Sequence, residues 1–415
     1  MGFQQGLSGL NAASKNLDVI GHNIANSGTV GFKASRTEFD EMVASAIGSA
    51  NGTNGGIGVS VGAIAQQFTQ GNISVTGNNL DVAINGNGFF QIQQNDGTMA
   101  YTRAGNFKLD KAGNVITNAG GKVMGYPVDP ATGKPTAGSP RPLVFPTGAP
   151  IPAKQTEKAK VTFNLDARAV EAATATPPTP RATYGTSITV YDSQGVPNTV
   201  SLYFEKTANP NEWSVYNQLD DPTATPPVVA TPVGTITFDG NGKITSGSTL
   251  TLNIATAPAN PNSPTPGPTF PVEFDFSDST QYGTKWAVSE STQDGYTAGQ
   301  LTGINIGTDG TILTRYSNGV TRPEGVVSLA TFRNTQGLSD IGNNLWVETF
   351  ESGQPTVGQP TNGAFGQLRS GALEDSNVDL TAELVNMMTA QRAYQANAQT
   401  IKTQDQIMST LVNLR

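Results

Sequence analysis

The single histidine of the chain, His22, is the first residue to consider for catalysis or metal binding. A Ser/His/Asp triad or a histidine-based zinc site would have to use this residue, because the sequence offers no second imidazole. His22 lies between Gly21 and Asn23 in a stretch with helical periodicity, without a fixed relation to a nucleophile. We therefore interpret it as a polar helix residue at a packing interface.

Two short glycine-containing stretches resemble ligand-binding loops only in part. Asp239 and Asn241 match the first and third positions of a calcium loop, but Lys243 stands at the fifth. Apolar Leu250 stands at the twelfth position, where a bidentate glutamate belongs. Residues 86–88 (Gly-Asn-Gly) lack the lysine and the following helix of a phosphate loop. Both stretches are predicted to be hairpin turns.

The adjacent carboxylates Glu374 and Asp375 have the residue type needed for acid–base catalysis. They precede a long helical pattern, and carboxylates near a helix N-terminus interact favourably with its dipole. That role is sufficient to explain them, so we expect no catalytic residue, no metal site, no cofactor and no enzyme activity. A carboxylate pair assembled from distant strands stays an open alternative.

Composition excludes several partner classes. The 415 residues carry a net charge of −8 and no lysine or arginine cluster, which argues against nucleic acid and anionic membranes as partners. The chain has no cysteine, only 13% charged residues and 47 glycines, a composition typical of an extracellular β-rich protein. No apolar run is long enough to span a membrane, and the N-terminus lacks the features of a cleaved signal peptide. We therefore expect export by a route that does not cleave a signal.

The C-terminal stretch, residues 380–412, must be positioned against a partner. Apolar or aromatic residues recur every seven positions and are partly interleaved with a second series, the pattern of a helix that hides a narrow seam against another helix. At about 1.5 Å per residue this rod is roughly 50 Å long. The predicted interface residues are Leu380, Leu384, Met387, Tyr394, Ala398, Ile401, Met408 and Val412.

The N-terminal stretch carries a matching stripe but is weak as a helix. Gly6, Gly9 and Gly21 lie inside it, and each interior glycine costs about 1 kcal/mol relative to alanine. We predict that it becomes ordered only when the C-terminal helix, neighbouring molecules or both cover the stripe. A membrane-surface helix is the alternative, although the only charges here are Lys15 and Asp18. The predicted interface residues are Phe3, Leu7, Leu10, Leu17, Ile20 and Ile24.

Proline separates these ends from the middle of the chain. Of 26 prolines, 23 fall between Pro127 and Pro271, and proline breaks helix interiors and central strands. Residues 36–47 are predicted to form a short helix, followed by a flexible glycine-rich connector. The glycines of this connector are Gly48, Gly52, Gly55, Gly56 and Gly58.

Alternating runs separated by turn residues predict two β domains, one nested inside the other. In the inner block, residues 80–84 and 89–93 are predicted to be strands of one hairpin, joined by a turn at residues 85–88. Further turns are predicted at residues 95–97, 110–113 and 308–310. In the outer block, strands are predicted at residues 161–165, 187–192, 199–206, 213–218, 235–238 and 272–276.

The predicted fold is mainly β with a helical terminal layer, in an elongated multi-domain subunit. The expected parts are a paired-helix, coiled-coil-like domain (1–30 and 371–415), a connecting region (31–71 and 351–370), an inner β domain (72–149 and 294–350) and an outer inserted β domain (150–293).

Three stretches carry a resemblance to a known family. NLDVIGHNIANSGTVGFKASR (16–36) resembles the signature of bacterial flagellar rod and hook proteins, and LDVAINGNGFF (80–90) resembles their second block. Residues 371–415, which end in QTIKTQDQIMSTLVNLR, are similar to the C-terminal block, particularly that of the hook members. His22 departs from the family, which usually has a second asparagine there. The size of the 150–293 insertion also favours a hook member over a rod protein.

The resemblance implies a structural subunit that polymerises into a curved, flexible tube, encloses the export channel and transmits motor torque to the filament. It implies as partners further copies of the chain, the distal rod protein, the hook cap protein, the hook-length control protein, the hook–filament junction protein and the flagellar export apparatus. Location would be the extracellular hook of the flagellum. Another axial component, such as the distal rod protein, is the nearer alternative. A secreted adhesin would not need seven-residue seams at both termini, and an extracellular hydrolase would need a catalytic constellation, of which the single histidine removes the commonest kinds.

Overall fold

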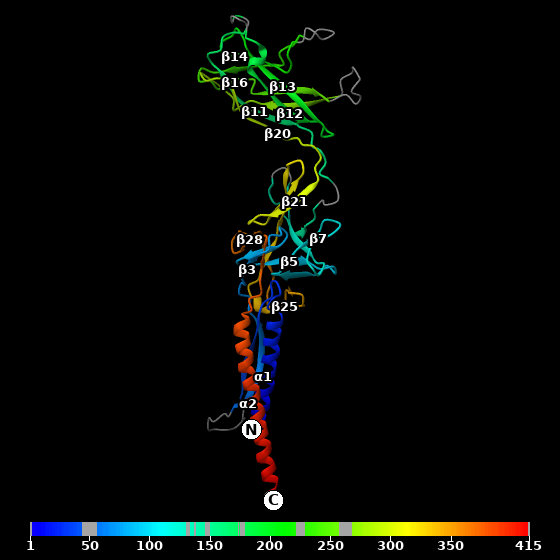
Figure 1. The fold of residues 1–415 in the computed structure, drawn as a ribbon, viewed down its shortest axis with the longest axis vertical. Helices are drawn as coiled ribbons and strands as arrows, with labels where there is room; N and C mark the ends of the chain where they lie inside the picture. The colour runs from blue at the N-terminus through cyan, green and yellow to red at the C-terminus, as the bar shows by residue number, and fades with distance from the viewer. Residues whose placement is uncertain are drawn as a thin grey trace. The chain divides into compact units, whose positions relative to one another are not determined.

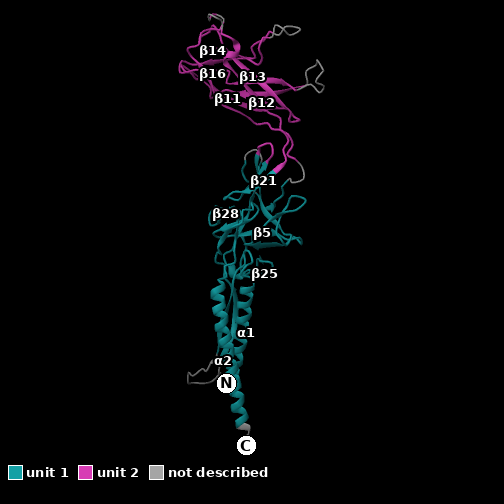
Figure 2. Ribbon diagram, in the orientation of Figure 1, with its two compact units in different colours: residues 1–148, 302–315, 321–415 teal, residues 149–301, 316–320 magenta. Residues whose placement is uncertain are grey.

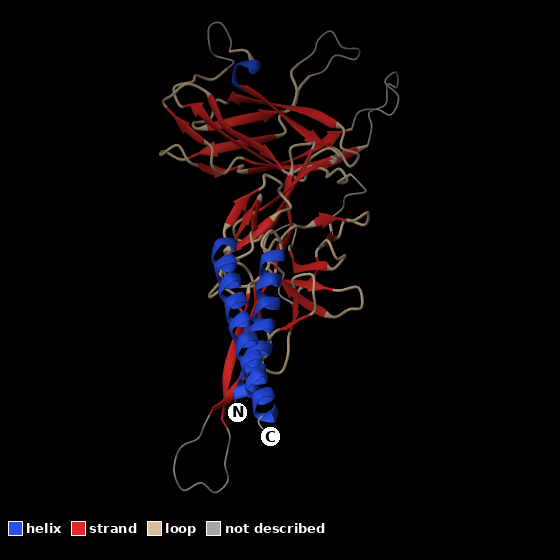
Figure 3. Cartoon of the chain, turned by 60° about the horizontal axis from the view of Figure 1, so that its bottom comes forward, coloured by secondary structure: helices blue, strands red, loops and turns tan. Residues whose placement is uncertain are grey.

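The computed structural model describes residues 2–43, 56–129, 133–136, 138–145, 150–172, 174, 179–220, 229–256 and 268–413. The chain is mostly β with one long helix at each end (Figures 1 and 3). It divides into two compact units, shown in Figure 2. Unit 1 comprises residues 1–148, 302–315 and 321–415, and unit 2 comprises residues 149–301 and 316–320.

Helices α1 (Gly2–Ala25) and α2 (Leu380–Asn413) lie side by side and antiparallel in unit 1 (Figures 1 and 3). A Cβ atom added at Gly6 would lie 3.0 Å from Ile401 Cγ1, and one at Gly9 would lie 2.8 Å from the Asn397 amide nitrogen. Gly6 and Gly9 therefore mark the close approach of the two helices, so they serve packing as well as weakening α1.

Capping residues set where these helices begin and end. The Asp379 carboxylate accepts hydrogen bonds from the backbone N–H groups of Thr381 and Ala382, at 2.9 and 3.1 Å, and so caps the N-terminus of α2. At the end of α1, the Asn26 side chain donates to the His22 carbonyl at 2.9 Å. The sequence reasoning assigned the helix-dipole role to Glu374 and Asp375, but Asp379 is the residue at the helix terminus.

The predicted helix over residues 36–47 is wrong where the structure describes it. Strand β1 (Ser35–Val43) pairs antiparallel with β2 (Gly56–Gln66), with bulges after Glu38 and Met42. In residues 59–66 (VSVGAIAQ), larger apolar residues alternate with small or polar ones, so side chains of one kind lie on one face of the strand. This alternation allows one face of the two-stranded ribbon to pack against α1. The Val59 N–H donates to Ser8 Oγ of α1 at 3.3 Å.

This ribbon also changes the interpretation of the predicted glycine connector. Gly56 and Gly58 belong to strand β2, so they are not part of a loop. Gly58 has φ +140° and lies against Ser8, where a Cβ atom would collide with the hydroxyl. Gly48, Gly52 and Gly55 lie outside the described residues.

The β part of unit 1 is built on one large sheet that joins residues from both halves of the chain. Its path runs β21–β22–β23–β9–β5–β6–β26–β25. Val327 pairs with Gly125, and Trp346 pairs with Tyr101, so strands far apart in sequence share the sheet. The strands of this path are β21 (Leu301–Ile306), β22 (Thr311–Tyr316), β23 (Thr321–Val327), β9 (Lys122–Pro127), β5 (Phe89–Gln93), β6 (Met99–Thr102), β26 (Leu345–Val347) and β25 (Ser339–Asp340).

Shorter strands complete this part. Five more strands pair onto the large sheet, and two pairs, β28 with β4 and β29 with β3, lie outside it. A 3₁₀ turn spans Thr335–Gly337. The shorter strands are β7 (Lys108–Leu109), β8 (Val115–Ile116), β10 (Arg141–Pro142), β24 (Leu329–Thr331), β27 (Thr356–Gly358), β3 (Ile73–Val75), β4 (Val82–Asn85), β28 (Gln367–Ser370) and β29 (Ala372–Glu374).

Most of the predicted turns in this part are present. Residues 95–97 join the paired strands β5 and β6, and residues 110–113 join β7 and β8. The turn at residues 308–310 joins β21 and β22. The predicted return of 89–93 onto 80–84 is wrong, because β4 pairs with β28 while β5 pairs with β6, β9 and β24. Gly86 and Gly88 have φ +110° and +129°, which suits a chain that leaves one sheet for another.

Unit 2 contains two five-stranded sheets that share one apolar core. Phe163 and Phe204, from different sheets, have ring centroids 4.4 Å apart. One sheet runs β17–β18–β11–β19 with β20 paired to β11, and the other runs β12–β13–β14–β15–β16. The strands are β11 (Lys158–Asp166), β12 (Gly185–Tyr191), β13 (Pro197–Lys206), β14 (Glu212–Tyr216), β15 (Gly234–Phe238), β16 (Ile244–Ser246), β17 (Thr249–Ala255), β18 (Thr269–Asp275), β19 (Thr280–Tyr282) and β20 (Ala287–Gln293), with a 3₁₀ turn at Arg181–Tyr184.

All six strands predicted for the outer block are confirmed, as β11, β12, β13, β14, β15 and β18. The sequence analysis missed β16, β17, β19 and β20. Strand β20 is exposed at every position but the last and mostly polar, so it carries no apolar alternation that would identify it.

Gly6 and Gly21 provide a matched test of the helix contact. Leucine at either position should favour helix formation by up to about 1 kcal/mol. Gly21 has open space around its Cβ position, whereas a side chain at Gly6 meets Ile401. We expect Gly21→Leu to slow amide exchange in α1 and Gly6→Leu to accelerate it by forcing the helices apart. Equal protection of α1 in the two variants would contradict this packing.

Candidate assembly interface

Six of the apolar residues predicted to form helix seams are exposed in the single chain. Their exposed fractions are 52% for Phe3, 44% for Leu7, 47% for Leu384 and 60% for Met408. Leu380 and Tyr394 are also exposed, while Leu10, Leu17, Ile24, Met387, Ala398 and Ile401 are half-buried and Ile20 is buried. The side chain of Val412 lies outside the described part of the chain.

The contact between the helices uses a different set of residues. Small or polar residues of α1 meet α2: Gly6 lies at Ile401, Gly9 at Asn397, and the Asn23 amide donates to Glu383 at 3.4 Å. Ala390 is the one residue of α2 that is buried among those described. The closest approach therefore falls beside the predicted stripe of α1 rather than on it, because small residues allow closer packing than leucine. Ile401 belongs to both sets, and the buried Ile20 of the predicted stripe also lies on the side of α1 that faces Ala390 of α2.

Helix α2 also continues beyond the start of α1. Gly6 lies opposite Ile401, and the helices are antiparallel, so the last two turns of α2 have no counterpart in α1. Ile407 and Met408 in these turns are 48% and 60% exposed. A helix with open apolar residues and a free end has the surface needed for contact with another molecule.

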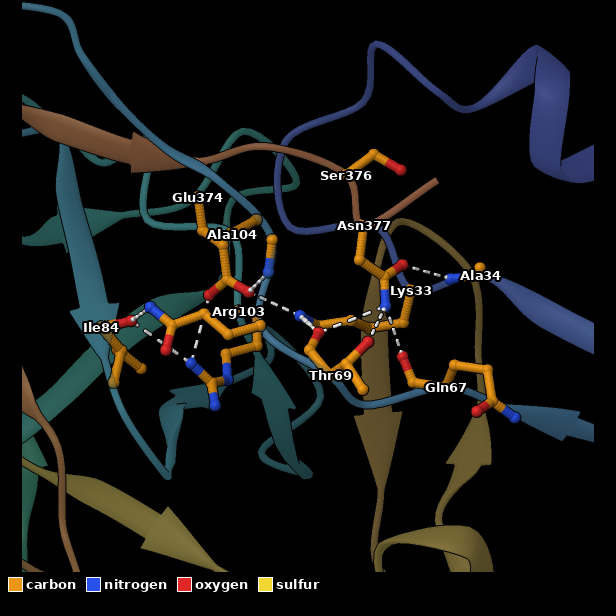
Figure 4. A network of polar contacts seen from close by, with 12 residues as sticks. Lys33, Ala34, Gln67, Thr69, Ile84, Arg103, Ala104, Glu374, Ser376 and Asn377 are labelled. Carbon is orange, nitrogen blue, oxygen red and sulfur yellow. Dashed lines mark hydrogen bonds and ion pairs between the residues drawn. The ribbon is translucent and has the colours of Figure 1, made fainter. Parts of the chain in front are cut away.

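A buried ionic cluster anchors the helices to the β part of unit 1 (Figure 4). The Lys33 ammonium donates to one Glu374 carboxylate oxygen at 2.5 Å, and Arg103 donates to the other at 3.1 Å. The side chains of Lys33 and Glu374 are fully buried, and that of Arg103 is 6% exposed. Burial lowers the pKa of Lys33 and of Arg103, and attraction to Glu374 opposes this effect.

Backbone groups supply most of the remaining hydrogen bonds of this cluster, and Arg103 Nε is the one donor of its guanidinium that is buried without a partner. Lys33 also donates to the Thr69 carbonyl at 2.7 Å, and the Gly71 N–H donates to Glu374 at 3.0 Å. Arg103 donates to the carbonyls of Ile84 and Gly86 at 3.4 and 2.8 Å. One carboxylate thus joins the segment after α1, the segment before α2 and the β part.

Two asparagines add to this junction. Asn23 exchanges hydrogen bonds with the backbone N–H and carbonyl of Ser35, at 2.9 and 2.8 Å. The Asn377 side-chain oxygen Oδ1 accepts from the Ala34 N–H at 2.7 Å, and the Asn377 Nδ2 donates to the Gln67 carbonyl at 2.7 Å (Figure 4). These side chains replace the backbone pairing that an irregular connection lacks.

No local sequence pattern predicts this cluster. The sequence predicts only a helix-dipole role for Glu374 and no role for Lys33, Arg103 or Asn377. Lys33, Glu374 and Asn377 lie inside the quoted family motifs, in a chain with only 13% charged residues. That scarcity of charge was the available signal, since a charge placed in an apolar motif needs a partner.

The other candidate sites have structural roles. The His22 ring packs at 5.4 Å from the Phe32 ring and lines an open cavity of about 530 Å³ in unit 1. Asp239 accepts the N–H groups of Asn241 and Lys243, both at 2.8 Å, and the bond from Lys243 holds the pKa of Asp239 below its usual range. Within the described ranges, no group of three or more His, Cys, Asp or Glu residues is arranged to hold a metal ion. No helix among them is long and apolar enough to cross a membrane.

Family models match most of the chain. The model for the flagella basal body rod protein matches residues 3–33, and that for the FlgE/F/G hook protein D1 domain matches residues 83–166. The FlaE D2 domain model matches residues 164–296, and the model for the C-terminal part of the FlgEFG rod proteins matches residues 369–414.

Full-length relatives decide the family. The flagellar hook protein FlgE of Salmonella typhimurium is 43% identical over 432 residues, which cover all of both chains. FlgE of Treponema pallidum is 31% identical over 457 residues, covering 99% of this chain and 98% of its own. The chain belongs to the FlgE family of flagellar hook proteins. It is a structural subunit of the hook, and full-length identity to FlgE leaves the alternative of another axial component unfavoured.

The fold agrees with this family. A crystal structure of the hook protein FlgE2 of Helicobacter pylori superimposes with a TM-score of 0.53 at 17% identity. The match covers 72% of this chain and all of that one. At this identity the likeness concerns the fold alone.

The buried cluster generates a stability prediction. Glu374→Gln keeps the shape of the side chain but leaves Lys33 and Arg103 buried without a counter-charge. We expect unit 1 to lose about 3–5 kcal/mol of stability while unit 2 is unchanged. Hydrogen exchange read separately on peptides of each unit measures this change. The matched control is Glu38→Gln, which breaks the exposed pair with Arg36 and should change little. Equal effects of the two substitutions would rule out an anchoring role.

Proposed function

We propose that copies of this chain assemble into the hook tube through the apolar residues that α1 and α2 leave exposed. The main support for this proposal is that Phe3, Leu7, Leu384 and Met408 are exposed, although α1 and α2 already contact each other through other residues. Complete burial of an exposed apolar side chain contributes about 1.5–3 kcal/mol, and each of these partly exposed side chains contributes a share of that free energy. The predicted seams then serve contacts between subunits more than the contact within one subunit.

The proposal extends to the layers of the tube. The terminal helical domain (1–30 and 371–415) lines the export channel, and the inner β domain (72–149 and 294–350) forms a middle shell. The connecting region (31–71 and 351–370) joins these two layers, and the outer domain (150–293) forms the surface. Support comes from the antiparallel helices, the β1–β2 ribbon that leads from α1 and the separate core of unit 2. A tube of this kind bends while it transmits torque from the motor to the filament.

The specific partners follow from the position of the hook between rod and filament. They are the distal rod protein, the hook cap protein, the hook-length control protein and the hook–filament junction protein. The export apparatus would deliver the chain through the channel without cleaving a signal peptide. The open C-terminal turns of α2, with Ile407 and Met408, offer an apolar surface for such axial contacts.

Leu384→Asp tests the assembly interface. Because Leu384 is 47% exposed, the substitution should leave the fold of the monomer unchanged. A charge buried at a subunit contact should raise the protein concentration needed for tube formation at least tenfold. Sedimentation and electron microscopy of the purified full-length chain measure this threshold. The control, Val170→Asp, places the same charge on an exposed valine of unit 2. Wild-type assembly by Leu384→Asp would remove the helices from the proposed interface.

Antibody labelling tests the layers and the location together. We expect antibody raised against residues 150–293 to label a short curved segment between basal body and filament in immunogold electron microscopy of detached flagella. Label on the rod would instead assign the chain to the rod. Hooks that are recognised by antibody against the whole chain but not by this antibody would place the insertion inside the tube wall.

A further inference from the structure

Phe350 is fully exposed among the residues that the structure describes. Its exposed fraction is 102%, the largest among the exposed apolar side chains described, and it lies in the turn after β26. An isolated exposed leucine or valine is ordinary, but a fully exposed phenylalanine leaves a large aromatic surface in water. Such residues at protein surfaces are enriched where another molecule binds.

The turn holds Phe350 outward through its hydrogen bonds. Ser352 is buried, its hydroxyl donates to the Thr349 carbonyl at 2.9 Å, and the Thr349 N–H donates to the same hydroxyl at 2.9 Å. Thr349 Oγ1 donates to the Gly337 carbonyl at 2.5 Å, and the Asn334 amide donates to the Glu351 carbonyl at 3.1 Å. A turn fixed in this way presents the ring without a further loss of backbone entropy on binding.

The surroundings of the ring are acidic. Glu348 and Glu351 flank it and are exposed. Glu348 accepts a hydrogen bond from the Tyr101 hydroxyl at 3.1 Å, whereas the Glu351 carboxylate has no partner among the described residues. A complementary surface should therefore combine apolar side chains with a positive charge.

The outer face of α2 has this composition. Val385 and Met388 are 51% and 53% exposed, and Arg392 is exposed one turn further along. Residues spaced by three and four positions lie on one face of a helix. This face differs from the one at α1, which carries Ala390 and Asn397. The Arg392 guanidinium has no partner within the described part of the chain.

We propose that Phe350 of one copy docks on the face formed by Val385, Met388 and Arg392 of a second copy. The face of the ring lies on the two apolar side chains and on the Arg392 guanidinium, which also pairs with Glu351. An arginine near an aromatic ring gains from both the charge and the stacking. This inference rests on the proposed assembly and adds a specific contact to it.

The occupant is a second copy because two different surfaces of the same chain complement each other. A contact between unlike surfaces is heterologous, and its repetition builds a ring or, where the rotation does not close, an open helical array. An array of this type is what a tube-forming subunit requires. The exposed residues of α2 used by the proposed assembly, such as Leu384, lie directly beside this face.

A charge exchange tests the pairing. We expect Glu351→Arg and Arg392→Glu each to raise the concentration threshold of tube formation about tenfold, and the double variant to restore most of it. Phe350→Ser should raise the threshold by a similar factor. All these side chains are exposed, so the melting temperature of the monomer should not change. The control is Glu290→Arg on the exposed strand β20, which should not restore assembly when it is combined with Arg392→Glu.

The outcomes separate this contact from the proposed function. Assembly of wild-type protein together with wild-type thresholds for the single variants would overturn the contact and leave the proposed assembly intact. Single variants that are impaired but not restored by the double exchange would also overturn it. A wild-type chain that fails to assemble would overturn the proposed function, and this contact with it.

Cross-linking gives a second, independent measurement. The chain has no cysteine, so introduced cysteines report on their own positions alone. Copies with Glu351→Cys, mixed and assembled with copies carrying Met388→Cys, should form disulfide-linked pairs on oxidation, since a disulfide requires Cα atoms about 4.4–6.8 Å apart. Copies with Tyr282→Cys, on unit 2, serve as the control partner for Met388→Cys. Tubes in which both pairs cross-link equally would contradict the contact.

Discussion

The buried carboxylate of Glu374 is the constraint on which the arrangement of unit 1 depends. It binds Lys33 and Arg103 at 2.5 and 3.1 Å, and these three residues come from three distant parts of the chain. Removing such charges from water is expensive, so the cluster is poor as a source of stability but strict about geometry. Only when the segment after α1, the segment before α2 and the β part are all in place do the charges compensate one another. The direction in which the helices leave the β part is thereby fixed.

Different residues of the helices make the contact within the subunit and provide exposed apolar surface, and the sequence periodicity alone does not distinguish the two sets. Gly6 and Gly9 permit a close approach to Asn397 and Ile401, while the larger apolar residues, such as Leu384, remain in water. A subunit that buried all of its apolar surface internally would have little left to drive polymerisation. One that exposed all of it would aggregate before assembly. The small-residue contact pairs the helices in the monomer and leaves the leucines for contacts with other copies.

Local sequence signals predicted a large part of the fold and a smaller part of the site. Turn residues with special backbone demands, such as Gly97 and Gly310, marked hairpins correctly, and apolar alternation marked the strands whose one face is buried. The signals failed where tertiary contacts decide: residues 36–43 form a strand because a ribbon can cover α1, and β20 carries no pattern because both its faces are exposed. The cluster around Glu374 escaped for the same reason, since its partners lie hundreds of residues apart.

The same reasoning explains why the family's motifs lie where the chain joins its parts. Lys33 lies in the first motif, while Glu374 and Asn377 lie in the last, and both motifs meet at the base of the helices. A strand in the core of unit 2 needs only apolar residues of suitable size, which many sequences provide. A buried charge needs one particular partner at one distance, and an asparagine that bridges two backbones needs both of them. The junction therefore requires particular residue types, which a short sequence motif can specify. The core of unit 2 requires only apolar residues at alternating positions, so it leaves no comparable motif.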